Sequence, residues 1–210
     1  MSYKILHDTG KPTCFIGDSY AIKSIIKIMS HLEIEQVSLE EALTKDKNWW
    51  DARQFFHAST QVAFRKSLVE KCQEFNPCWI SFVSDTNVID SKVTIGKNVL
   101  VNQFNHLYGP AIIEDHSIIT SFCQISHLVL IKEFNYISPY SYLCFTELGK
   151  GNCLATRSVF LGKSMDSPLV TADWCNFIVN STVTKSVRQT GTYFGNRMID
   201  NKCSLESKIL

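Results

Sequence analysis

One histidine of this sequence lies in a segment whose residue types suit proton transfer. His127 falls within residues 123–139, directly after Ser126 and beside a run of aliphatic residues. An imidazole has an unperturbed pKa of about 6.5, so it can accept a proton from an amine or hydroxyl nucleophile near neutral pH. A well-placed general base typically accelerates a reaction by about 10²–10⁴-fold. We therefore take His127 as the candidate base and Ser126 as the group that orients its ring; a solvent-facing histidine without a role is the alternative.

A glycine turn near the N-terminus is the second candidate site. Gly17, Asp18, Ser19 and Tyr20 follow a short apolar segment and precede an amphipathic segment that ends near residue 31. In a strand–turn–helix arrangement, the helix N-terminus offers free amides to a phosphate. The turn contains only one glycine and an acidic neighbour, so a purely structural turn is the alternative.

The eight cysteines do not indicate a metal site or a disulfide framework. No two of them form a C-x-x-C pair, and no histidine lies at ligand spacing from two of them. We expect reduced and mostly buried thiols, with Cys123 as a packing residue. His106 and His116 are expected at the surface or at the edge of the core.

A six-residue repeat must position these candidates. Helices repeat their apolar face every three or four residues and strands every two, so a sustained period of six fits neither element alone. It fits a chain that turns a corner every six residues, in which three steps make one triangular coil of about eighteen residues. The inward aliphatic positions are Val83, Ile89, Ile95, Val101, Leu107, Ile113, Ile119, Ile125, Ile131, Ile137 and Leu143. A buried charge such as Ile119→Asp should prevent folding of this region, so a soluble and cooperatively unfolding variant would contradict the column.

The first 82 residues have a different pattern. Strands are expected over 13–17, 32–39, 53–58 and 77–83, and helices over 19–31, from 40 after a cap at Ser38, and over 60–75. Residues 45–48 are expected as an exposed turn. This alternation favours a small parallel sheet in an α/β domain, residues 1–82, followed by a coil domain, residues 83–210.

Beyond residue 148 the repeat becomes irregular. Leu148, Leu154 and Phe160 continue it one residue out of phase, and residues 162–168 are expected as an exposed loop. Residues 170–183 are expected to add about one more coil. Residues 184–210 show no repeat and are expected to cap the last coil.

Composition excludes several classes of protein. Twenty-one basic and twenty acidic residues give a formal net charge of +1, and no basic cluster marks a nucleic-acid partner. No apolar segment reaches the roughly 18 residues of a membrane span, and the start does not resemble a secretion signal. We expect a soluble, cytoplasmic protein with no nucleic-acid or membrane partner.

The repeat resembles that of the hexapeptide-repeat acyltransferases, which fold as left-handed parallel β-helices. The segment 123–139 narrows the resemblance to the sialic acid O-acetyltransferase and bacillosamine-pathway UDP-amino-sugar N-acetyltransferase family, which has a small Rossmann-like domain before the β-helix. The similarity extends through residues 146–152 and to residues 191–197. It implies an α/β Rossmann-like domain followed by a left-handed β-helix with a C-terminal cap.

The resemblance also assigns roles to residues. His127 matches the catalytic base of the family, with Ser126 and Leu128 in place of the acidic residues that flank it. Tyr136 matches a second histidine near acetyl-CoA, and the glycine that contacts the oxyanion falls at Cys144 or Phe145.

The remaining implied sites lie near the two ends of the chain. Gly195 and Asn196 fall in the family's coenzyme A segment. The family's Gly-x-Gly-Gly turn for the nucleotide sugar is reduced here to Gly17, with Asp18, Ser19 and Tyr20 around it.

These matches imply an acetyl-CoA-dependent N-acetyltransferase. Its acceptor would be a nucleotide-linked amino sugar such as a 4-amino-4,6-dideoxyhexose, and the acceptor amine would attack the thioester directly. The family also implies a homotrimer with coenzyme A between adjacent β-helices and no metal. Two alternatives remain open, namely O-acetylation of a sialic acid-type sugar and a non-catalytic β-helix scaffold.

Overall fold

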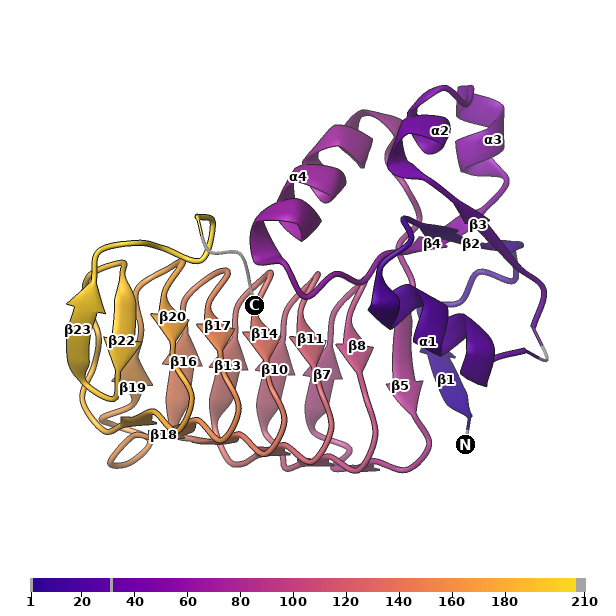
Figure 1. The fold of residues 1–210 in the computed structure, drawn as a ribbon. Helices are drawn as coiled ribbons and strands as arrows, with labels where there is room; N and C mark the ends of the chain where they lie inside the picture. Colours follow the sequence, from indigo (N-terminus) through magenta and orange to yellow (C-terminus); the bar gives the residue numbers. More distant parts are fainter. Residues whose placement is uncertain (1, 31, 207–210) are drawn as a thin grey trace.

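The computed structural model describes residues 2–30 and 32–206. A three-sided prism of stacked parallel strands carries a smaller α/β unit at its N-terminal end, as Figure 1 shows. The repeat therefore predicts the architecture correctly.

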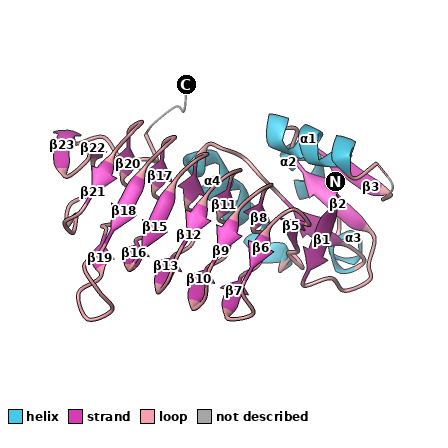
Figure 2. Cartoon of the chain, turned by 90° about the horizontal axis from the view of Figure 1, so that it is seen from below, coloured by secondary structure: helices cyan, strands magenta, loops and turns pink. Residues whose placement is uncertain are grey.

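Each side of the prism is one sheet. Face 1 contains, in spatial order, β1 (Tyr3–Leu6), β5 (Ser81–Ser84), β8 (Leu100–Val101), β11 (Ile118–Ile119), β14 (Tyr136–Ile137), β17 (Cys153–Leu154), β20 (Asn176–Phe177), β22 (Thr192–Phe194) and β23 (Arg197–Asp200). Face 2 contains β6 (Val88–Ile89), β9 (His106–Leu107), β12 (Gln124–Ile125), β15 (Tyr142–Cys144), β18 (Val159–Leu161) and β21 (Thr182–Val183). Face 3 contains β7 (Val93–Ile95), β10 (Ala111–Ile113), β13 (Val129–Ile131), β16 (Thr146–Leu148) and β19 (Leu169–Val170). Figure 2 shows the strands of faces 2 and 3 in two neighbouring rows.

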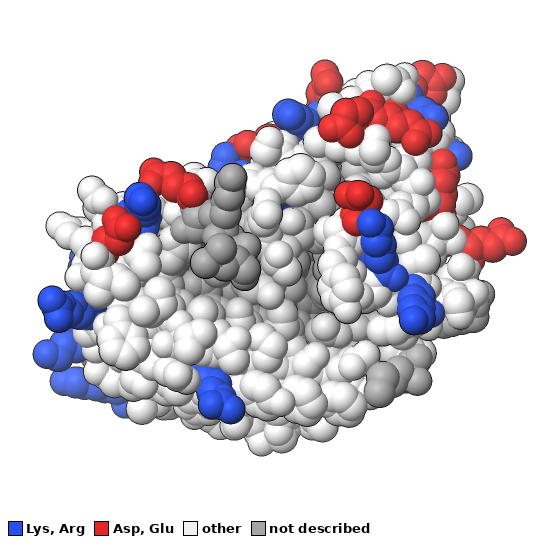
Figure 3. Space-filling view, viewed as in Figure 1, with Lys and Arg blue, Asp and Glu red and all other residues white. Residues whose placement is uncertain are grey.

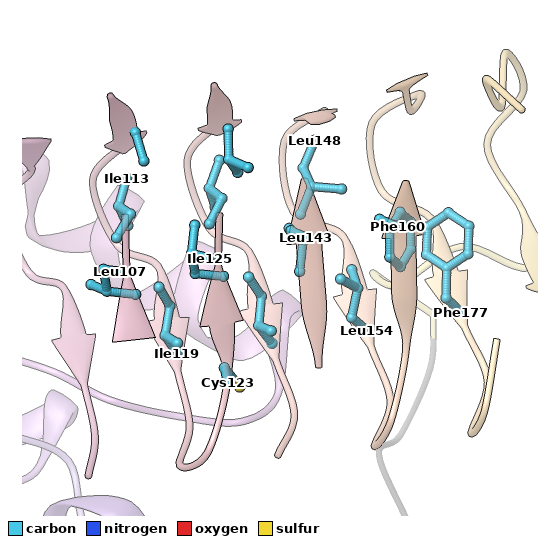
Figure 4. Close-up of a cluster of buried hydrophobic side chains, with 14 of the residues drawn as sticks. Leu107, Ile113, Ile119, Cys123, Ile125, Leu143, Leu148, Leu154, Phe160 and Phe177 are labelled. Carbon is cyan, nitrogen blue, oxygen red and sulfur yellow. The ribbon is translucent and has the colours of Figure 1, made fainter. Parts of the chain in front are cut away.

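The inward aliphatic side chains form the continuous core that the repeat predicts. Ile119 pairs with Val101 and Ile137 in neighbouring coils, and its side chain is fully buried. Figure 4 shows the column along the prism axis. A five-residue step from Leu143 to Leu148 produces the phase shift seen in the sequence. Cys123 is buried in the same cluster, which confirms its packing role, and all eight cysteines are free thiols.

Left-handed backbone conformations turn many of the corners of the prism. Phe104, Phe122 and Tyr140 have φ values of +58°, +61° and +62° at equivalent positions in successive coils. Their rings stack with centroids 5.1 Å apart at each step, and all three are exposed. We call these three residues the aromatic ladder; it lies where face 1 meets face 2. Stacking with the ring one coil away compensates part of the cost that a residue other than glycine pays in this conformation.

The α/β unit contains a parallel sheet in the order β3-β2-β4. Its elements are β2 (Thr13–Ile16), α1 (Tyr20–Ile28), β3 (Ile34–Val37), α2 (Leu39–Leu43), α3 (Lys47–Asp51), β4 (Gln54–Phe56), α4 (Val62–Cys72) and the 3₁₀ helix η1 (Gln73–Phe75). The predicted cap at Ser38 is confirmed, because its side chain accepts a hydrogen bond from the Glu41 amide at 3.0 Å.

Two predictions for this unit are only partly correct. The segment 45–48 is not simply an exposed turn, because Asp46 accepts a hydrogen bond from the Trp49 amide at 2.9 Å and so begins α3. The expected fourth strand, residues 77–83, joins the small sheet only through a parallel bridge between Phe55 and Trp79. Its second half, β5, belongs to face 1, where it pairs antiparallel with β1, a strand that the sequence did not predict.

The C-terminal region covers the end of the prism. Residues 163–168 form the predicted exposed loop, and the coils continue through β22, which pairs antiparallel with β23. The Ser204 hydroxyl donates a hydrogen bond to Gly151 O at 2.6 Å, which fixes the described part of the tail against earlier coils. Within residues 2–30 and 32–206, no helix is both long and apolar enough to cross a membrane.

Candidate active site

His127 lies at the corner where face 2 passes into face 3. It stands between β12 and β13, and the next residue, Leu128, turns the corner with φ +53°. Its ring is exposed, and Nδ1 lies 3.3 Å from Gly109 O. Since a carbonyl only accepts hydrogen bonds, this contact favours the tautomer with the proton on Nδ1. Nε2 then keeps a free lone pair, which is the form that a general base requires.

Aromatic and polar side chains of face 2 surround this corner. The ring of Tyr108 lies 5.5 Å from that of His127 between centroids, and His106 stacks on Tyr108 at 4.0 Å. The Tyr142 hydroxyl interacts with Ser126 and Cys144, and burial raises the pKa of Tyr142. Ser126 therefore contacts Tyr142, and the partner that orients the His127 ring is the Gly109 carbonyl.

The two candidates for the oxyanion contact lie one coil further along the same corner. The amide of Phe145 donates to His127 O at 3.0 Å, so it is not available to a ligand. That backbone hydrogen bond excludes the predicted role for the Phe145 amide. Cys144 is buried in β15 and pairs with Leu161 of β18 in the parallel ladder, where its carbonyl accepts from the Gly162 amide at 3.0 Å. Its peptide group therefore belongs to the sheet, and its predicted role gains no support from the structure either.

The predicted coenzyme A residues near the C-terminus have structural contacts. Asn196 Nδ2 donates to Lys185 O at 2.9 Å, and its Oδ1 accepts from the Thr184 amide at 3.2 Å. Gly195 has φ +57°, and its amide donates to Ser181 Oγ at 3.2 Å. The β22–β23 turn therefore holds the segment around Lys185 in place.

A small cavity lies beside that segment. Its volume is 170 Å³, and it is lined by Gly162, Lys163, Ser167, Pro168, Leu169, Thr184, Lys185 and Ser186. Residues 184–186 follow β21, which is three strands beyond β12 on face 2. At about 4.8 Å per strand, the cavity is ~14 Å from the level of His127 along the prism.

A larger cavity separates α1 from face 1. Its volume is 290 Å³, and it is lined by Tyr3, Tyr20, Ser24, Ile25, Ile28, Thr60, Leu100, Asn102, Gln103, Ile118, Thr120 and Tyr136. None of these side chains is charged, and the surface over face 1 is largely uncharged in Figure 3. Tyr136 lies here, where burial raises its pKa. Tyr136 and Tyr20, predicted from separate motifs, thus meet in one cavity.

The rest of the Gly17 turn supports α1 and does not line this cavity. Ser19 donates to Ala58 O and accepts from the Ile22 amide at 3.3 Å, while Asp18 pairs with Lys23 at 3.7 Å. Gly17 is buried with φ +101°.

A buried histidine lies beneath this turn. A Cβ added to Gly17 would lie 3.4 Å from His57 Nδ1. His57 Nδ1 donates to Ile16 O at 2.7 Å, while its buried Nε2 has no partner among the residues that the structure describes. Sequence reasoning did not identify His57, whose position is visible only once β4 pairs with β2.

Within one chain, His127 and Tyr136 lie on different sides of the prism. Tyr136 belongs to face 1, whereas His127 occupies the corner between faces 2 and 3, which is opposite face 1. No three His, Cys, Asp or Glu side chains in the described ranges are arranged to hold a metal ion.

Comparisons with known proteins give structural matches only. No family model and no curated protein sequence matches this chain. WeeI from Acinetobacter baumannii superimposes with a TM-score of 0.77 at 18% identity, over 90% of this chain and 99% of that one. The acetyltransferase domain of PglB from Neisseria gonorrhoeae, in complex with acetyl coenzyme A, gives 0.76 at 12%, over 90% and 98%.

A third match is a complex with two ligands. PerB from Caulobacter crescentus, in complex with CoA and GDP-perosamine, gives a TM-score of 0.72 at 15% identity, over 86% of this chain and 92% of that one. The resemblance found in the sequence is thus confirmed at the level of fold: over nearly its whole length, the chain folds like hexapeptide-repeat sugar acetyltransferases.

Proposed function

We propose that this protein is an acetyl-CoA-dependent N-acetyltransferase whose acceptor is a nucleotide-linked amino sugar. The observation that carries the proposal is the exposed imidazole of His127, whose Nδ1 lies 3.3 Å from Gly109 O and whose Nε2 is therefore the nitrogen that can accept a proton. As the acceptor amine attacks the acetyl thioester, Nε2 takes the proton that the amine loses. Coenzyme A leaves as the thiolate and becomes the thiol by receiving that proton from the imidazolium.

Coenzyme A is proposed to lie along the corner that carries His127. The cavity with Lys163 and Lys185 is ~14 Å further along this corner, a distance that an extended pantetheine arm can span. Two ammonium groups there would attract the phosphates of coenzyme A. Gly195 and Asn196 act by holding the Lys185 segment. The complexes of PglB with acetyl coenzyme A and of PerB with CoA support the choice of cofactor.

The acceptor is proposed to bind between α1 and face 1. We treat the α/β unit as a Rossmann-like nucleotide-binding domain in which the Gly17 turn and Tyr20 approach the nucleotide. The uncharged cavity beside Tyr136 would then receive the sugar ring. The GDP-perosamine bound to PerB supports an amino sugar of this kind.

A second copy of the chain is required by this arrangement. The cavity and His127 lie on different sides of one prism, so the acceptor on one subunit would meet His127 of the partner subunit. A closed homotrimer satisfies this requirement three times. The aromatic ladder, three exposed stacked rings beside face 2, is the surface that we assign to this contact. Phe122→Asp should reduce the mass measured by light scattering to that of the monomer, and an unchanged trimer would contradict this assignment.

The decisive experiment measures thiol release from acetyl-CoA with UDP-, dTDP- and GDP-linked 4-amino-4,6-dideoxyhexoses. His127→Ala should lower kcat by about 10²–10⁴-fold. His7→Ala is the matched control, because His7 is exposed and lies at the start of the prism, where it contacts the carbonyls of residues 95 and 96. No release above the His127→Ala background would refute the proposal. Calorimetry with coenzyme A separates the enzyme, which should bind it, from a scaffold.

A further inference from the structure

A polar cavity lies at a different corner of the prism from His127. It has a volume of 420 Å³ and is lined by Val69, Glu70, Gln73, Asn76, Pro77, Trp79, Lys97, Asp115, His116, Glu133 and Phe134. These residues come from α4, from η1 and the segment that joins it to β5, and from the corner where face 3 passes into face 1. The volume falls within the range of about 300–1,000 Å³ that is usual for small-molecule sites.

His116 is the buried polar group of this cavity. Only 9% of its surface is exposed. Its ring stacks on Phe134 at 4.8 Å with an interplanar angle of 17°, and it is perpendicular to Trp79 at 5.8 Å. The imidazole is therefore held rigidly between two aromatic rings.

The hydrogen bonds of Asn98 determine which nitrogen of His116 carries the proton. Asn98 Oδ1 accepts from the His57 amide at 2.8 Å, so its Nδ2 must be the atom that lies 3.0 Å from His116 Nδ1. Because Nδ2 is a donor, Nδ1 is an acceptor and the proton resides on Nε2. Burial also lowers the pKa of His116 to about 4, so the ring is neutral. Nε2–H has no hydrogen bond to any described residue, and with Nδ1 held by Asn98 it is the donor left to the cavity.

Carboxylates supply acceptors next to this donor. Asp115 Oδ1 accepts from the Lys97 amide at 2.7 Å, and Glu133 Oε2 pairs with Lys150 at 2.8 Å. Asp115 Oδ2 and Glu133 Oε1 have no partner among the residues that the structure describes. The cavity thus offers one fixed N–H donor, free carboxylate oxygens and parts of the Phe134 and Trp79 rings; Phe134 itself lies between His116 and Trp174.

This combination selects the chemistry of the ligand. The lining has three carboxylates and one lysine, and Lys66 and Lys150 pair with Glu70 and Glu133, so the cavity is nearly neutral and does not favour an anion. Within the described ranges, no group of side chains meets the geometry of a metal site. A sugar has hydroxyls that both accept and donate hydrogen bonds, and apolar C–H surface that packs on aromatic rings. We propose that this cavity binds a monosaccharide unit at a site separate from acetyl transfer, and that it prefers an amino sugar, whose ammonium group pairs with Glu133 and Asp115.

The test is a calorimetric titration of the full chain with methyl 2-amino-2-deoxy-α-glucopyranoside and with methyl α-glucopyranoside. Both should bind saturably, and the amino sugar should bind more tightly. His116→Phe preserves the aromatic stack but removes the N–H donor, so it should weaken both by at least about tenfold. Glu133→Gln should weaken the amino sugar more than the neutral sugar.

Controls separate this site from the proposed active site and from loss of folding. Glu74→Gln changes an exposed carboxylate of η1 outside the cavity and should leave both affinities unchanged. His127→Ala should bind both sugars as the wild type does, whatever its effect on thiol release. Thermal denaturation checks that each variant is folded, and Glu133→Gln tests the site if His116→Phe does not fold. No saturable binding of either sugar, or affinities unchanged in the variants, would overturn the proposal.

Discussion

A fully buried arginine joins α4 to the prism, and its replacement should weaken the whole molecule. Arg65 Nε donates to His116 O at 2.8 Å, and Nη2 donates to Phe134 O at 2.6 Å and Asn135 O at 3.2 Å. Nη1 donates to Ser59 O. No acidic side chain in the described ranges pairs with this guanidinium. It therefore stabilises the junction by binding backbone carbonyls that would otherwise be buried without partners.

The magnitude follows from the number of carbonyls that lose their partner. In Arg65→Met the side chain keeps its length, but Ser59 O, His116 O and Phe134 O become unsatisfied, each at about 1–3 kcal/mol. Removing a buried charge offsets part of this cost. We expect a loss of about 3–5 kcal/mol in the free energy of unfolding. Arg65→Lys should lose about 2 kcal/mol, because a single ammonium group cannot reach all of these carbonyls.

Equilibrium urea unfolding followed by far-UV circular dichroism measures the loss. Lys66→Met is the matched control, since it is the next residue of α4 and its ion pair with Glu70 is partly exposed. It should cost no more than about 1 kcal/mol. The reasoning would be refuted if Arg65→Met unfolded within about 1 kcal/mol of the wild type. In Arg65→Met the cavity between α1 and face 1 should also change, because Arg65 is one of the residues that hold the α/β unit on the prism.

Two further predictions concern pH and a crowded corner. Burial holds the pKa of His57 and His116 at about 4, against about 6.5 in the unfolded chain, so the unfolded state binds more protons between these values. The contribution of these histidines to the free energy of unfolding is complete above pH ~6.5 and should decrease as the pH falls towards 4. At one pH unit below 6.5 the loss should be about 1.4 kcal/mol per histidine. Urea unfolding midpoints that do not change between pH 6.5 and 4 would contradict the burial of the two rings. A Cβ at Gly151 (φ +62°) would lie 2.0 Å from the Trp174 ring, whereas one at Gly10 (φ +72°) meets nothing within 4 Å. Gly10→Ala should therefore lose only the about 1–2 kcal/mol that a left-handed backbone conformation costs a residue with a Cβ, and Gly151→Ala should lose clearly more. Equal shifts in melting temperature for the two variants would show that Trp174 moves away at no cost.

The repeat could be predicted because each of its positions has a local physical reason. An aliphatic residue at every sixth position has to face inward. A charged residue at one of these positions, as in Ile119→Asp, would interrupt the repeat visibly in the sequence. The step from Leu143 to Leu148 was also visible as a change of phase. Much of the α/β unit follows from amphipathic segments in the same way.

The contacts that join distant segments could not be predicted in this manner. The short strand β1 carries no strong pattern of its own and forms because β5 offers it an edge. Ser126 was assigned to His127 because the two residues are adjacent in the sequence. Adjacent side chains of an extended chain point in opposite directions, however, and Ser126 contacts Tyr142 on the next coil. His116 and Arg65 acquire their roles only when α4 packs on the corner. The periodicity of the sequence predicts which face of the prism a side chain lies on. Which side chain it contacts there depends on the register between coils.

The same register decides how the proposed chemistry must be assembled. Every coil returns to the same three faces, so a group fixed to the corner between faces 2 and 3 stays opposite face 1 throughout the prism. No side-chain rotation brings His127 to the cavity beside Tyr136, because the buried core column lies between them. Only a second prism can place a face 1 cavity against this corner. A variant that loses the contact at the aromatic ladder should therefore keep its fold and both halves of the site but lose acetyl transfer. Mixing it with an excess of His127→Ala subunits should restore activity only if the two kinds of subunit form mixed trimers.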